Sequence, residues 1–202
     1  MKAVLISIQP KWCELIASGK KTVEVRKTRP KIKTPFKCYI YETQGRTETP
    51  FVDEDGHVIF KGRGQVIGEF VCDEIIGTCL WRLAGKTGLC AKRTEKEKNL
   101  PDNACLTLEE IERYAGSVGR GIYGWHISDL VIYDEPKELS EFYVEGDCDC
   151  MNCKNCAWFD RGNGYNVEDD CNLVYKGIAE HKSFKPITRP PQSWCYVEEV
   201  PG

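Results

Sequence analysis

The chain has 202 residues, 41% of them hydrophobic and 10% aromatic, which excludes a disordered protein and suits one domain with an elaboration. A formal net charge of −3 argues against a polycation that coats nucleic acid. The charge is nevertheless uneven: residues 20–37 hold eight Lys or Arg and one acid, Glu24, whereas residues 134–170 hold eleven acids and three bases. Such asymmetry indicates that one face attracts anions and another is solvated.

The N-terminal apolar run soon meets Gln9 and Pro10, so it is too short for a signal sequence and is interpreted as a strand. No other segment has the length and hydrophobicity of a membrane span. Twelve cysteines without an export signal indicate a reducing compartment, where clustered thiols favour metal over disulfides. We therefore expect a cytoplasmic protein that does not contact a membrane.

The first half of the chain alternates in a way that predicts short strands. Residues 2–8 form the first strand, and Pro10 opens a helix that Gly19 ends. A second strand is predicted over residues 21–27, with Thr22, Glu24 and Arg26 on one side and Lys21, Val23 and Val25 on the other. A basic loop then leads to a third strand over residues 36–41.

The second half is interpreted in the same way. An Asp-Gly turn between apolar runs predicts a hairpin over residues 51–60, and a capping box at Thr107 opens a helix through Tyr114. The other expected elements are a long strand (65–76), a polar loop with a helical turn (80–103), a strand (125–133) and a short helix (136–142). Helices do not alternate strictly with strands, so we expect a compact mixed β-barrel decorated with short helices.

The segment from Gly19 to Arg26 draws attention because Glu24 is embedded in positive charge. On a strand, Glu24 and Arg26 are two residues apart and can pair, and Lys21 projects toward the same cleft. Such groups are suited to tuning proton transfer or to holding an anion. The alternative is an ordinary basic strand edge with one salt bridge.

The spacing Gly-x-Lys-x-x-Glu-x-Arg, met by Gly19, Lys21, Glu24 and Arg26, resembles the signature of the ASCH domain family. The runs Ile8-Gln9-Pro10, Tyr39-Ile40-Tyr41 and Gly124 to Leu130 also resemble ASCH proteins, and Arg189 to Tyr196 resembles the C-terminus of phage and prophage members. The resemblance covers residues 1–143 and 187–199. It implies an α+β fold built on a PUA-like β-barrel.

The same resemblance implies binding of RNA or a modified nucleotide in a cleft lined by the motif. Lys21 and Arg26 would bind phosphate or a base edge, and Glu24 would orient them or accept a hydrogen bond from an exocyclic amine. Aromatic side chains would stack on bases, although most aromatics in a barrel belong to the core. The full set of candidate binding residues is Lys21, Glu24, Arg26, Trp12, Trp125, Arg189 and Trp194.

Two other functions stay open beside this binding module. Some ASCH members are similar to amidohydrolases that act on N4-acetylcytidine, in which case Lys21 would activate water and Glu24 would shuttle protons. Those members carry a threonine where this chain has Glu24, and their distant glutamate is matched best by Glu109 or Glu110. The other alternative is a non-catalytic phage-type interaction protein that acts through its acidic, Cys-rich lobe.

Four cysteines between Cys148 and Cys156, followed by Cys171, have the spacing of a metal site. The predicted ligands of a structural zinc ion are Cys150, Cys153, Cys156 and Cys171, with Cys148 or His181 as substitutes. An iron–sulfur cluster and free thiols in a loop are the alternatives. The resulting organisation is a barrel (1–143), a Cys-rich zinc insertion (144–175) and a C-terminal segment that returns to the barrel (176–202). We interpret Cys13 and His126 as structural, with catalytic roles as the alternative.

Overall fold

The computed structural model describes residues 2–44, 51–52, 58–59, 62–83, 86–89, 99–116, 121–147 and 182–198. Most of these residues lie in two curved sheets. The larger sheet contains, in the order of pairing, β10 (Ser128–Lys137), β6 (Val66–Cys72), β3 (Phe36–Glu42), β1 (Lys2–Ile8), β13 (Trp194–Glu198), β11 (Tyr143–Asp147) and β12 (Lys182–Pro186). β1 runs parallel to β3 and antiparallel to β13, so the C-terminal strand lies beside the first one.

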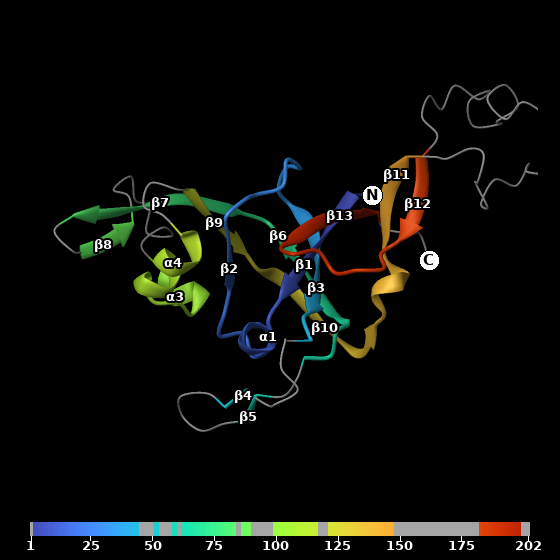
Figure 1. Cartoon of the computed structure of the whole chain (residues 1–202), viewed down its shortest axis with the longest axis horizontal. Helices are drawn as coiled ribbons and strands as arrows, with labels where there is room; N and C mark the ends of the chain where they lie inside the picture. Colours follow the sequence, from blue (N-terminus) through green and yellow to red (C-terminus); the bar gives the residue numbers. More distant parts are fainter. Residues whose placement is uncertain are drawn as a thin grey trace, which may run out of the picture.

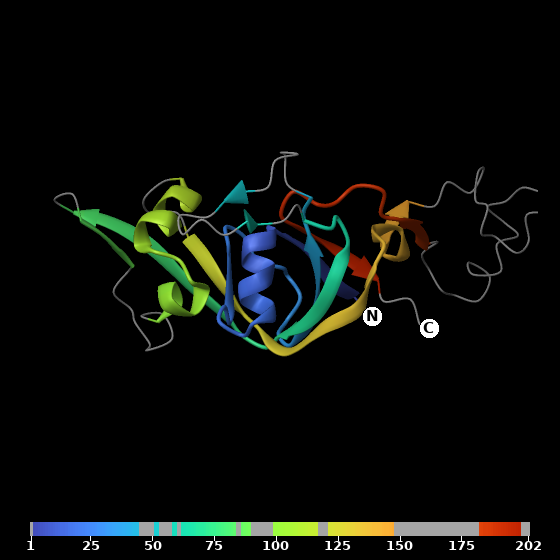
Figure 2. The same ribbon diagram turned by 90° about the horizontal axis from the view of Figure 1, so that it is seen from below.

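The smaller sheet has the order β2 (Val23–Arg26), β9 (Gly121–His126), β7 (Ile75–Leu83) and β8 (Lys86–Leu89), and β4 (Phe51–Val52) pairs with β5 (Val58–Ile59). The helical elements are α1 (Pro10–Ala17), α3 (Leu100–Ala104), α4 (Leu108–Ala115) and the 3₁₀ turn η1 (Leu139–Glu141). Figure 1 shows α3 and α4 beside the smaller sheet at one end of the molecule, with β11 and β12 at the other. Figure 2 shows the strands curving around α1 as a half-barrel. The predicted PUA-like α+β architecture is confirmed.

Two buried clusters lie on either side of β2 and β9. One fills the half-barrel between α1, β1, β3 and β6, and the ring of Trp125 from β9 belongs to it. The other lies between the smaller sheet and the helices α3 and α4, and includes Val25 from β2. Because side chains alternate across a strand, β2 presents Val25 to the second cluster and Glu24 and Arg26 to the opposite side.

Local signals predicted the helices well. Pro10 occupies the first turn of α1, and Gly19 follows it with φ of +72°, a conformation that glycine adopts without steric cost. The predicted capping box of α4 is present, with the Thr107 side chain accepting from the Glu110 N–H and the Glu110 carboxylate accepting from the Thr107 N–H. Gly116 ends this helix with φ of +82°.

Several predicted strands are divided differently in the structure. The strand expected over 21–27 is limited to β2, because the N–H groups of Lys21 and Thr22 donate to Leu15 and Asn103 instead of a strand. The single strand expected over 65–76 is two strands that belong to different sheets, β6 and β7. The strand expected over 125–133 is divided into β9 and β10 at Ile127, whose N–H donates to the Thr22 carbonyl.

The remaining expectations have mixed outcomes. The hairpin over 51–60 is confirmed by the β4–β5 pairing. The loop expected over 80–103 is wrong in part, because this range contains the end of β7 and all of β8, whereas α3 agrees with the helical turn expected there. The helix expected over 136–142 is reduced to η1, since β10 continues to Lys137. No described helix is long and apolar enough to cross a membrane. The three-part division at residues 144 and 176 stays a prediction.

Substitution of Thr107 tests whether its side chain stabilises α4 as a helix cap. This helix also supplies three pocket residues described below. We expect Thr107→Ala to lower the free energy of unfolding by about 1 kcal/mol, because the helix loses its capping hydroxyl. Urea denaturation measures the change, and Thr107→Ser, which keeps the hydroxyl, serves as the control. Equal stability of the wild type and Thr107→Ala would contradict the capping role.

Candidate functional site

A pocket of about 750 Å³ opens where β1, α1, β2 and α4 meet the segment before β13. Its volume lies within the range of sites that bind small organic ligands. Its polar walls come from five stretches of chain, contributing chiefly Ser7; Gln9 and Trp12; Lys21, Glu24 and Arg26; Glu110, Arg113 and Tyr114; and Gln192 and Ser193. Residues that are nearly two hundred positions apart therefore share one cavity.

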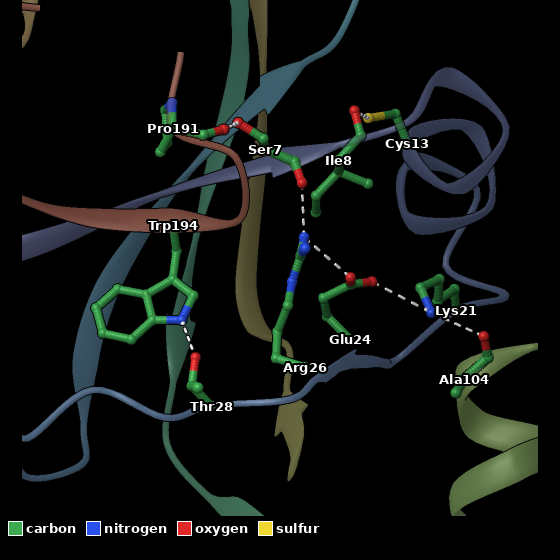
Figure 3. Close-up of polar contacts among 10 residues, drawn as sticks. All are labelled: Ser7, Ile8, Cys13, Lys21, Glu24, Arg26, Thr28, Ala104, Pro191 and Trp194. Carbon is green, nitrogen blue, oxygen red and sulfur yellow. Dashed lines mark hydrogen bonds and ion pairs between the residues drawn. The ribbon is translucent and has the colours of Figure 1, made fainter. Parts of the chain in front are cut away.

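Three charged side chains form one buried cluster in the wall of this pocket (Figure 3). Glu24 accepts from both cations: its Oε2 lies 3.3 Å from Lys21 Nζ, and its Oε1 lies 3.1 Å from Arg26 Nη2. The exposed fractions are only 2% for Lys21 and 7% each for Glu24 and Arg26. We call these three residues the ion triad. Its net charge of +1 is held in a place that water reaches poorly.

Backbone carbonyls hold the two cations from outside the triad. Lys21 Nζ donates to the Ala104 carbonyl at the end of α3 over 2.7 Å, and Arg26 Nη2 donates to the Ser7 carbonyl of β1 over 2.7 Å. The triad thus joins β1, β2 and α3. Removing one member of such a buried group leaves the others without compensation, which is far more costly than losing a surface pair.

The guanidinium of Arg26 has unused hydrogen-bonding capacity. Both of its contacts in the described part of the chain use Nη2, and its Nε is buried there without an acceptor. A buried donor without a partner is costly and uncommon. Water does not reach this Nε in the structure, so an acceptor atom of a ligand would satisfy it only after neighbouring side chains move.

Aromatic rings flank the ion triad. The Lys21 ammonium lies 5.1 Å from the centre of the Trp12 ring, and Lys11 lies at the same distance from that ring. Tyr114 forms part of the wall on α4, and Lys27 lies 5.0 Å from its ring centre. These distances are typical of cation–π contacts. The pocket therefore combines positive charge with flat apolar faces.

Four of the seven predicted binding residues line this pocket, and three do not. Lys21, Glu24, Arg26 and Trp12 are brought together. Trp125 is completely buried in the core, where it packs against Phe36 and Trp194, so its ring offers no face to a ligand. Arg189 is exposed and outside the lining. Trp194 also lies outside it, and its Nε1 donates to Thr28 Oγ1 (Figure 3).

The assignment of Lys21 to the opposite side of the strand from Glu24 was wrong. Lys21 precedes β2, and its backbone N–H donates to Leu15 at the end of α1. Strand alternation therefore does not apply to it, and its side chain reaches Glu24. The expectation that both project toward one cleft agrees with the pocket lining.

Several pocket residues had no signal of their own in the sequence. Arg113 and Tyr114 follow Glu110 by one helical turn, so the face of α4 could have been extended to them once Glu110 was suspected. Gln192 and Ser193 enter the site because the Ser7 N–H donates to the Ser193 carbonyl and Ser7 Oγ donates to the Pro191 carbonyl. No local pattern reports such long-range bonds.

Of the two candidates for the distant glutamate, only Glu110 lines the pocket. One of its carboxylate oxygens, Oε2, accepts from the Thr107 N–H over 2.8 Å. Glu110 therefore serves as a helix cap and as a pocket wall at once.

Cys13, Cys72 and His126 have the surroundings of structural residues, and Cys79 is in a disulfide. Burial raises the pKa of the Cys13 thiol far above its ordinary value, and the thiol donates to the Ile8 carbonyl. Burial likewise raises the pKa of Cys72 to about 12. A thiol that stays protonated is a poor nucleophile. His126 Nδ1 lies 2.7 Å from Asp73 Oδ1, away from the pocket.

The predicted zinc ligands Cys150, Cys153, Cys156 and Cys171, and the substitutes Cys148 and His181, lie outside the described residues. Within the residues that are described, no group of three or more His, Cys, Asp or Glu has a metal-binding arrangement. The zinc site stays a prediction.

A comparison with family models matches the ASCH domain to residues 6–126, which is more than half of the chain and contains the ion triad. The chain belongs to the ASCH domain family. Its sequence is 21% identical to the ASCH protein of Zymomonas mobilis, with a TM-score of 0.45, 68% of this chain covered and 73% of that one. A variant of the Zymomonas protein with serine replaced by alanine is 16% identical, with a TM-score of 0.49 and coverages of 98% and 89%. A comparison with curated proteins found no match.

Glu24 should be the most stability-critical charge of this ASCH domain. We expect Glu24→Gln to lower the free energy of unfolding by about 3–5 kcal/mol, because two buried cations lose their shared counter-charge. Chemical denaturation measures the loss. The same substitution at the exposed Glu109 of α4 is the matched control and should change stability by less than about 0.5 kcal/mol. Equal effects at the two positions would contradict the role of the ion triad.

Proposed function

We propose that this ASCH domain binds RNA or a modified nucleotide in the pocket that contains the ion triad. The observation that carries the proposal is the buried triad, with its net positive charge and an Arg26 Nε that has no partner among the described residues, in a pocket that Trp12 and Tyr114 also line. Family membership supports it, since the ASCH match over residues 6–126 contains the triad.

Each part of the site has a role in this proposal. A base stacks on an aromatic wall, Trp12 or Tyr114, and takes the place of a lysine that lies over that ring. Arg26 donates to a ligand acceptor through its unused Nε. Glu24 holds both cations and thereby keeps Arg26 in place. Arg113, exposed at the rim on α4, contacts phosphate.

Adjacent lysines offer a matched pair for the test. Lys21 lies in the triad, whereas Lys20 is exposed. We expect Lys21→Met to weaken RNA binding about tenfold or more, the loss typical of a charged hydrogen-bonding group, and Lys20→Met to change it by less than about threefold. Fluorescence anisotropy with a short single-stranded RNA at low salt measures both.

A second variant tests the proposal even if Lys21→Met does not fold. Arg113→Gln alters an exposed side chain, so its fold should be kept, and we expect weaker binding with a shallower salt dependence. Absence of RNA binding by the wild type at low salt, or unchanged binding by both variants, would overturn the proposal.

Amide hydrolysis is the second candidate function. Lys21 and Glu24 are in contact at the pocket wall, as it requires, and Glu110 supplies another carboxylate there. The reaction adds water to N4-acetylcytidine and yields cytidine and acetate. Under this alternative, the wild type releases cytidine and Lys21→Met does not, as chromatography would show. No release at high protein concentration would exclude it and leave a binding module.

A further inference from the structure

The loop between β2 and β3 carries a row of cations that the pocket does not use. Exposed and covered residues alternate along it: Arg29, Lys31 and Lys33 are exposed, whereas Pro30 is buried and Ile32 packs against the core cluster of the half-barrel. The inward residues fix the loop, and its exposed residues are four cations (Lys27, Arg29, Lys31 and Lys33) with Thr28, Thr34 and Pro35.

Contacts with β13 and β9 hold this basic loop in place. Trp194 Nε1 donates to Thr28 Oγ1 over 3.0 Å, and the Lys31 N–H donates to the Tyr196 hydroxyl oxygen over 2.6 Å. The Arg29 guanidinium lies 5.8 Å from the centre of the Tyr123 ring. The cations are therefore presented from an anchored backbone, which lowers the entropy lost when they bind a ligand.

The loop encloses a second hollow of about 660 Å³. Arg29, Lys31 and Lys33 line it together with apolar residues including Ile75, and its lining contains no acid. Among the described residues, Lys27 and these three cations take part in no ion pair. Four uncompensated charges within seven residues repel one another unless an anion is bound.

The row of cations begins at the rim of the first pocket. Lys27 follows Arg26 directly and lies against Tyr114, and both Arg26 and Tyr114 line that pocket. Arg29 lies against Tyr123, which is paired with Arg26 across β2 and β9. Lys27 therefore lies next to the pocket, and Arg29, Lys31 and Lys33 follow it along the loop.

We propose that Lys27 and the hollow lined by Arg29, Lys31 and Lys33, together called the groove, bind the phosphate backbone of a single-stranded RNA, one nucleotide of which occupies the pocket. This inference rests on the proposed function and adds that the ligand is an oligonucleotide and not a free nucleoside. Lysine and arginine side chains are the usual partners of phosphate oxygens. An acidic protein is the less favoured occupant, because protein interfaces are centred on apolar and aromatic anchors, whereas here the outward side chains are cations.

The dependence of affinity on RNA length tests the groove separately from the pocket. The wild type should bind a 12-nucleotide RNA more tightly than a trinucleotide. The triple variant Arg29→Gln, Lys31→Gln, Lys33→Gln should lose about tenfold or more for the 12-mer and reduce its log–log salt slope by about 2, since each phosphate contact on a single strand contributes about 0.7. Its trinucleotide affinity should stay within about twofold of the wild type.

Single substitutions provide the matched control. Lys31→Gln should weaken 12-mer binding, whereas Lys137→Gln, an exposed lysine at the end of β10, should not. Melting temperatures close to the wild type would show that the variants are folded.

Five outcomes would overturn the groove. A 12-mer bound no more tightly than the trinucleotide, an unchanged salt slope in the triple variant, or equal effects of Lys31→Gln and Lys137→Gln would each do so while leaving the pocket proposal intact. Equal competition by a polyglutamate peptide of matched charge would indicate a general anion surface instead. Failure of both RNAs to bind the wild type would instead remove the proposed function and the groove with it.

Discussion

One carboxylate, that of Glu24, balances two buried cations, and much of the site is organised by this constraint. Lys21 contacts this carboxylate from the turn after α1, and Arg26 contacts it from the end of β2, the strand that also carries Glu24. Each cation then contacts a carbonyl from another part of the chain, Ala104 in α3 or Ser7 in β1. Because a buried charge without a partner is costly, the triad holds these elements in one arrangement.

The same constraint links the fold to the chemistry of the pocket. β2 is the edge strand of the smaller sheet, and alternation along it turns Val25 toward the apolar cluster packed under α3 and α4 and Glu24 and Arg26 to the other side. All three residues line the cavity, which therefore opens along this edge. The triad is therefore a polar wall built on a rigid strand. The triad carries one net positive charge, Arg26 Nε has no acceptor among the described residues, and Trp12 and Tyr114 line the same pocket.

Sequence reasoning reached the features that depend on neighbouring residues and missed those that depend on distant ones. The ASCH motif, the ends of α1 and the capping box of α4 are short-range patterns, and all are present in the structure. The side chain of Lys21 was assigned to the wrong side because a backbone bond to Leu15 delays the start of β2. Gln192 and Ser193 reach the pocket because β13, near the end of the chain, pairs with β1 at its start. Trp125 was predicted to bind the ligand, but it is fully buried in the core. Its residue type alone does not distinguish these two roles.

The central claim is that a ligand enters the pocket and engages the ion triad through Arg26. Nitrogen–proton NMR correlation spectra of arginine Nε groups during titration with RNA test it most directly, because Arg26 Nε has no acceptor among the described residues. The account predicts a downfield shift of the Arg26 Nε–H signal that saturates together with binding, as expected for a donor that gains an acceptor. A saturating RNA titration that leaves this signal unmoved would contradict it.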